Sequence, residues 1–187
     1  MLAPSVWNSL EIAKLIVASI TPVVVAVVAY LLNRALRRAE NRQWFSQKLV
    51  EKRIELLSEA LPDLNDLYCY FAWVGRWKEF SPPDILLRKR RLDQLVYANS
   101  PFFSPEARAA YDVFLQVLFE TFVQPGKSAR FRTGLTSQHG SRVKAFIDDW
   151  DPSWNDMFAP EEKRTSPDVI NDRYQALVSV LGSEVGT

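Results

Sequence analysis

The sequence predicts an all-α protein with a single N-terminal transmembrane helix, a basic helical stalk and a cytoplasmic bundle of four to five helices. Residues 12–32 form an apolar run with one charged side chain, as a membrane span requires. Apolar residues from Val50 onward recur at alternating spacings of three and four, which is the period of an amphipathic helix. Three Ser-Pro pairs mark further helix starts, and no alternation of apolar and polar residues predicts a sheet.

The apolar run 12–32 is long enough to cross a bilayer. At 1.5 Å per residue, a helix of about 21 residues covers roughly 31 Å, close to the thickness of the hydrocarbon core. Its one charged residue, Lys14, lies near an end, where a long side chain can reach the interface. The run is long, lacks a basic start and ends without a small-residue cleavage pattern, so we expect an anchor and not a signal peptide.

The charges on either side of this run predict its orientation. Residues 1–11 contain no basic side chain, whereas residues 33–53 contain seven. The positive-inside rule then places the N-terminus outside the inner (plasma) membrane and the remainder of the chain in the cytoplasm. Pro22 removes a backbone hydrogen bond in mid-span and is expected to bend the helix. The residues expected in the anchor and at its interfaces are Trp7, Lys14, Pro22, Tyr30, Arg34, Arg37 and Arg38.

The sequence divides into four predicted segments. They are a short extracytoplasmic N-terminus at 1–11, the transmembrane helix at 12–32, a basic juxtamembrane stalk at 33–48 and a cytoplasmic α-helical domain at 49–187. Within the domain, helices are expected at 49–79, 82–98, 105–123, 141–150 and 167–181. Ser81, Ser104 and Ser166 each precede a proline, which is typical of an N-cap followed by the first helical residue. Pro62 is expected to kink or divide the first helix, and 124–140 is expected to be irregular.

Composition argues against several classes of function. The net charge of +1 is too small for a dedicated nucleic-acid-binding protein, so no specific nucleic acid is expected. One cysteine and one histidine form neither a disulfide nor an ordinary zinc site. Gly126-Lys127-Ser128 resembles the end of a P-loop, but Thr121 stands where that motif needs a glycine. We therefore expect no cofactor, no metal and no catalytic site.

A candidate interaction surface is drawn from three patterns. Ile54 and Leu57 belong to the amphipathic stripe, and the aromatic run around Trp73 and Trp77 is too broad for one helix face, although core packing is the alternative explanation. Basic side chains cluster nearby and could contact the anionic inner leaflet, with a solvated face as the alternative. The candidate residues are Ile54, Leu57, Trp73, Arg76, Trp77, Arg88, Arg91, Lys127, Arg130 and Arg132.

Three functional hypotheses follow. The first is a single-pass, membrane-anchored, non-enzymatic interaction or scaffold module that associates with itself or with a protein partner. The second is a membrane-disrupting effector whose oligomerised cytoplasmic domain gathers the kinked transmembrane helices. The third is a membrane-tethered hydrolase that uses the acidic segment from Asp148 to Asp156. The expected partners are lipids of the anionic inner leaflet and either a homo-oligomer or a protein partner.

Overall fold

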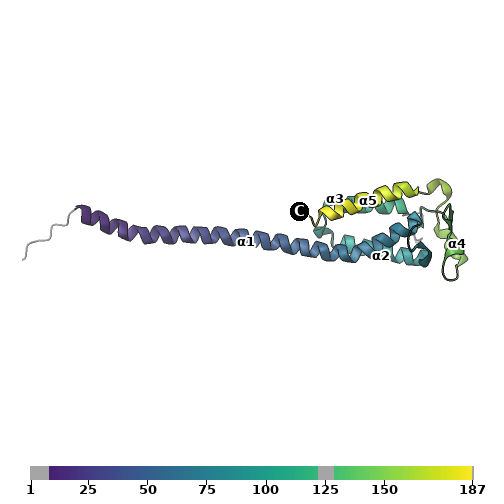
Figure 1. The fold of residues 1–187 in the computed structure, drawn as a ribbon, viewed down its shortest axis with the longest axis horizontal. Coiled ribbons are helices and arrows are strands. Elements are labelled where there is room, and N and C mark those ends of the chain that lie inside the picture. Colours follow the sequence, from purple (N-terminus) through teal and green to yellow (C-terminus); the bar gives the residue numbers. More distant parts are fainter. Residues whose placement is uncertain (1–8, 122–128, 187) are drawn as a thin grey trace, which may run out of the picture. The chain divides into compact units, whose positions relative to one another are not determined.

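The computed structural model describes residues 9–121 and 129–186, although not every side chain between residues 9 and 43. In these residues it contains five α-helices, four short 3-10 helices and four strands of two residues each, so the fold is all-α, as predicted. The chain forms two compact units, Met1–Lys48 and Leu49–Thr187, and each is described by itself. Figure 1 shows the elements in chain order, from purple to yellow.

Helix α1 (Ser9–Ala72) contributes residues to both units. In the first unit, the segment Ala18–Arg38 is 21 residues long and has a mean hydropathy of 1.7, and none of its described side chains is buried. It is therefore long and apolar enough to cross a membrane. The predicted span starts earlier, at residue 12, where several side chains lie outside the described residues. The helix is continuous through Pro62, so this proline does not divide it, and of the two predicted effects only a kink is compatible with the structure.

Helix α1 ends at Ala72, seven residues before the predicted end of this helix, and its end is set by Trp73. Trp73 has a backbone φ of 61°, in the left-handed region. Many helices end at a residue in this region, but residues other than glycine rarely adopt it. The next turn contains Gly75, whose φ of 58° suits a glycine. The chain then enters the short 3-10 helix η1 (Trp77–Glu79). The prediction of helix to residue 79 is wrong because Trp73 turns the backbone.

Helices α2 (Pro82–Ala98), α3 (Pro105–Leu118) and α5 (Pro167–Ser183) begin where the sequence predicts. Each has a serine N-cap whose hydroxyl accepts a backbone N–H, and a proline at the first helical position. Ser81 also forms a capping box with Asp84. Helix α3 ends five residues before the predicted position, because Phe119 leaves the helical conformation and starts a short strand.

The segment between α3 and α5 contains the elements that the sequence does not predict. Strand β1 (Phe119–Glu120) pairs with β2 (Arg130–Phe131), and β3 (Thr136–Ser137) pairs with β4 (Gly140–Ser141), both antiparallel. Helix α4 (Arg142–Ala145) is only one turn long, because Phe146 is extended, so the predicted helix 141–150 is wrong. The 3-10 helices η3 (Pro152–Met157) and η4 (Glu161–Lys163) also lie in this segment, whereas η2 (Ser100–Phe102) lies between α2 and α3.

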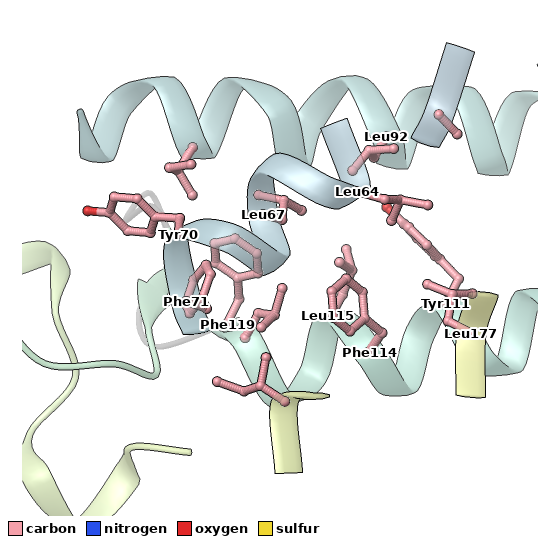
Figure 2. Close-up of a cluster of buried hydrophobic side chains, with 14 of the residues drawn as sticks. Leu64, Leu67, Tyr70, Phe71, Leu92, Tyr111, Phe114, Leu115, Phe119 and Leu177 are labelled. Carbon is pink, nitrogen blue, oxygen red and sulfur yellow. The ribbon is translucent and has the colours of Figure 1, made fainter. Parts of the chain in front are cut away.

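The hydrophobic core of the second unit lies between the C-terminal part of α1 and helices α2, α3 and α5. Figure 2 shows Leu64, Leu67 and Phe71 of α1 directed toward side chains from α3 and its end. Phe71 contacts Phe119 edge to face, with ring centres 5.1 Å apart. Helices α3 and α5 pack along each other (Figure 1), and Leu177 of α5 is fully buried in this core.

Candidate interaction surface

In the first unit, the described residues of the predicted anchor present an apolar surface followed by a basic one. Lys14, Pro22 and Tyr30 are exposed, and Trp7 lies outside the described residues. Arg34, Arg37 and Arg38 are exposed at helical spacings of three and four, so they share one face of α1 with Tyr30. This end of the apolar run can therefore present several guanidinium groups to anions on one side of the helix. Large apolar side chains that are about half exposed or more precede these arginines on α1. They are Ile20, Val24, Val25, Val27, Val28, Leu31 and Leu32.

In the second unit, α1 carries an outer stripe, which we define as Val50, Ile54 and Leu61. Ile54 is 49% exposed and Leu61 is 40% exposed, and the two lie seven residues apart on one helix face. Val50, four residues before Ile54, is half-buried. Leu57 is buried in the core instead, so its assignment to an exposed surface is wrong. The outer stripe is thus an apolar helix face that the second unit covers only in part.

Trp73 and Trp77 are buried in the core and do not form an exposed surface. Their indole rings enclose the guanidinium of Arg142, whose Cζ lies 3.8 Å from the ring centre of Trp73 and 5.6 Å from that of Trp77. The ring of Tyr70 completes this cage at 4.0 Å. The two tryptophan rings therefore contact a side chain of the same protein, Arg142, and core packing is the correct explanation of the aromatic run.

Arg142 is the residue in this region that the sequence gives no reason to select. It is 1% exposed and donates hydrogen bonds to the carbonyl oxygens of Tyr70 at 2.8 Å and Gly134 at 3.1 Å. Among the described residues, its Nη1 and the Tyr70 hydroxyl are buried without a hydrogen-bond partner. Burial lowers the pKa of Arg142 to about 10 and raises the pKa of Tyr70 to about 12. The cage joins the end of α1 to the start of α4.

The two candidate basic residues of α2, Arg88 and Arg91, form ion pairs with α1. Arg88 Nε lies 3.0 Å from Asp66 Oδ2, and Arg91 Nη2 lies 2.7 Å from Asp63 Oδ1. The guanidinium of Arg88 also stacks on the ring of Phe80 at 4.3 Å. These contacts hold α2 against α1. They also reduce the positive charge that this helix can offer to an anionic surface.

The other basic candidates lie in separate places. Arg76 is exposed and pairs with Glu79 at 2.7 Å. Arg130 and Arg132 are half-buried at β2, where the backbone N–H of Arg132 donates to Leu118 at 2.8 Å. Lys127 lies outside the described residues. Because Leu57, Trp73 and Trp77 are buried, the ten predicted residues do not form one exposed surface.

The acidic segment of the hydrolase hypothesis lies around η3, and its aspartates are exposed. The Asp151 carboxylate accepts the backbone N–H of Ser153 at 2.8 Å, which lowers its pKa and caps η3. Asn155 accepts the indole N–H of Trp150 at 3.0 Å. In the part of the chain that the structure describes, no three His, Cys, Asp or Glu side chains are grouped to hold a metal ion.

No protein-family model, curated protein or solved structure matches this chain.

Proposed function

We propose that this chain is a single-pass protein of the inner (plasma) membrane whose cytoplasmic helical unit is a non-enzymatic interaction module that associates with a second copy. The observation that carries this proposal is the outer stripe on α1. Isolated exposed apolar side chains are ordinary, but Ile54 and Leu61 lie on one face of the helix that also provides the candidate span. A second copy held by its own span in the same membrane is the partner best suited to that face.

The membrane part of the proposal is supported by exposed apolar side chains and by charge. A row of half-exposed valines and leucines would be unfavourable in water, and burying each in lipid contributes about 1 kcal/mol or more. The basic residues that follow, including Arg34, Arg37 and Arg38, favour the cytoplasmic side and contact with anionic lipid. The apolar side chains predict insertion into a membrane, and the basic residues predict that the second unit lies in the cytoplasm.

Anchoring explains how a small stripe can be sufficient for association. Covering Ile54, Leu61 and part of Val50 contributes only about 2–3 kcal/mol per copy, which is weak for proteins free in solution. Two anchored copies are confined to one membrane in the same orientation, which raises their effective concentration. Parallel helices also place Ile54 of each copy at the same height, as a short coiled-coil contact requires.

The test compares the size of the full chain with that of a stripe variant in uncharged detergent micelles. We expect the unmodified chain to be a dimer or larger, and Ile54→Asp combined with Leu61→Asp to be a monomer. The control is Leu87→Asp, because Leu87 is an exposed leucine on α2, outside the stripe. Leu57→Asp is unsuitable because Leu57 is buried, so this substitution would unfold the domain.

A chain that remains monomeric over the full range of protein-to-detergent ratios would contradict self-association. The same holds for a stripe variant that keeps the oligomeric state of the unmodified chain. Circular dichroism of each variant verifies that the helices are retained.

A further inference from the structure

Helices α2 and α3 enclose a cleft of about 410 Å³ on the surface of the second unit. A cleft of this size is sufficient for a small ligand or for one side chain of a partner. Its α2 wall consists of Lys89, Asp93 and Tyr97, which follow one another at intervals of four residues. Asp112 and Gln116 provide the α3 wall. The cleft is separate from the outer stripe on α1.

Two tyrosines hold the walls of the cleft together. Tyr97 donates its hydroxyl to Asp112 at 2.7 Å, and Tyr111 donates its hydroxyl to Asp93 at 2.8 Å. The two rings meet edge to face, with centres 6.3 Å apart. Both hydrogen bonds join α2 to α3, and the donor is on α2 in the first and on α3 in the second. The polar groups of the cleft are therefore fixed in place before any ligand arrives.

The charges of the cleft do not cancel. Asp93 uses one carboxylate oxygen for Tyr111 and the other for Lys89, whose Nζ lies 2.5 Å away. Asp112 accepts Tyr97 on one oxygen, and no ion pair is found for it in the described part of the chain. Arg108, one turn before Asp112, lines an internal apolar cavity instead. Among the described residues, the cleft therefore holds one carboxylate, that of Asp112, that is in no ion pair.

An aromatic surface lies beside that carboxylate. Tyr97 is 55% exposed, although its hydroxyl is held by Asp112. This hydrogen bond, burial and nearby negative charge raise the pKa of Tyr97 to about 12, so the hydroxyl stays protonated at neutral pH. An exposed ring next to a carboxylate is the arrangement that attracts an organic cation. Exposed Gln116 and Thr121 supply further polar groups at the edge.

We propose that the α2–α3 cleft binds an organic cation, with an ammonium or guanidinium group held between the Asp112 carboxylate and the ring of Tyr97. Such a group is present both in a free polyamine and in a lysine or arginine side chain of a peptide. A divalent metal ion is a poorer match, because it prefers several oxygen ligands and the cleft offers one free carboxylate.

The test uses the full chain, labelled with ¹³C in its tyrosine rings and held in uncharged detergent micelles. Spermidine is the free-amine probe, and N-acetyl-arginine amide is the side-chain probe, each titrated at constant ionic strength. We expect a saturable shift of the Tyr97 signal with a Kd of about 1 mM or tighter for at least one probe. Binding of spermidine alone identifies a free amine, whereas binding of the arginine derivative alone identifies a peptide side chain.

Two variants test the contributions of the Asp112 carboxylate and the Tyr97 ring to binding one at a time. Asp112→Asn keeps an oxygen for the Tyr97 hydroxyl but removes the charge, so the affinity should fall about tenfold. Tyr97→Leu removes the ring and should weaken binding about threefold, as measured by calorimetry. The control is Asp172→Asn, because Asp172 is an exposed acid of α5 that does not line the cleft. The proposal is overturned if neither probe gives a saturable shift, or if Asp112→Asn binds as tightly as the control.

Discussion

Arg53 of α1 forms an ion pair with Glu184 at the end of α5, with Nη2 and Oε2 3.1 Å apart. The Glu184 side chain is only 6% exposed. Its other oxygen accepts the backbone N–H of Ser104, the N-cap of α3, at 3.3 Å. Arg53 also donates from Nε to the carbonyl of Phe102 at 2.8 Å. This ion pair and its two hydrogen bonds therefore join the beginning, the middle and the end of the second unit.

We expect Glu184→Gln to lower the free energy of unfolding by about 2–3 kcal/mol, because Arg53 then keeps its charge in a largely buried position without a counterion. The matched control is Glu55→Gln, which removes an exposed pair with Lys52 three residues away. Exposed pairs of this kind contribute about 0.5 kcal/mol or less. Urea denaturation of the full chain in micelles, followed by tryptophan fluorescence, measures both. Equal losses of unfolding free energy in the two variants would show that the Arg53–Glu184 pair stabilises the domain no more than an exposed ion pair does.

The ion pairs between α1 and α2 give a second prediction. Arg88 is mostly buried between Asp66, Asp63 and the ring of Phe80, whereas Arg90 on the same helix is exposed. Arg88→Gln should therefore destabilise the domain by about 1–2 kcal/mol, and Arg90→Gln by less than about 0.5 kcal/mol. Thermal unfolding of the two variants tests this prediction, because both lose one positive charge and differ only in the contacts that are removed. A larger effect of Arg90→Gln would contradict the pairing.

Local signals in the sequence predicted part of this fold, and contacts between distant residues determined the rest. The starts of α2, α3 and α5 depend on a serine and a proline that are neighbours in the chain, so they could be predicted. The end of α1 depends on Trp73 in a left-handed conformation, which the amino-acid type disfavours. The partners of Arg142 include Tyr70, which lies 72 residues earlier, and no spacing rule connects them.

The candidate interaction surface could also be predicted only in part from the sequence. The periodicity after Val50 correctly indicates an amphipathic helix, but it does not say which side of a broad apolar arc faces the core. In the structure, Leu56 and Ala60 are buried, and the helix is rotated so that Ile54 faces outward. The α2–α3 cleft could not be predicted either, because it depends on tyrosines of two helices exchanging hydrogen bonds.

The buried hydroxyl of Tyr70 gives a prediction about alkaline pH. It has no hydrogen-bond partner among the described residues, so Tyr70→Phe should leave stability at pH 7 unchanged or raise it by up to about 1 kcal/mol. The pKa of Tyr70 is about 12 in the folded chain and ordinarily 10. Between these values the unfolded chain loses the Tyr70 proton first, so the contribution of Tyr70 to folding stability is full below pH 10 and falls as pH rises to 12.

The size of that alkaline loss can be measured by comparison with the variant. A difference of two pKa units corresponds to about 2–3 kcal/mol, which the unmodified chain should lose relative to Tyr70→Phe between pH 10 and 12. Urea denaturation at several pH values in this range provides the comparison. Parallel curves for the two proteins would show that the Tyr70 hydroxyl ionises as readily in the folded chain as in the unfolded one.

The proposed orientation gives the last prediction. If the basic residues after the span hold the second unit in the cytoplasm, replacing Arg34, Arg37 and Arg38 with glutamine should invert a measurable fraction of the chains. The readout is protease digestion of a C-terminal tag in cells whose inner membrane is exposed but intact. The tag of the unmodified chain should be protected, and the tag of the variant should be partly cleaved.

The control for orientation replaces three exposed basic residues that lie far from the span, Arg90, Lys144 and Arg173, with glutamine. This variant loses the same total charge, but only basic residues within about 15–20 positions of a span influence its orientation strongly. Its tag should therefore remain protected. Cleavage of the tag in the unmodified chain would place the second unit outside the membrane. Equal cleavage in both variants would show that net charge, and not the position of the arginines, determines the orientation.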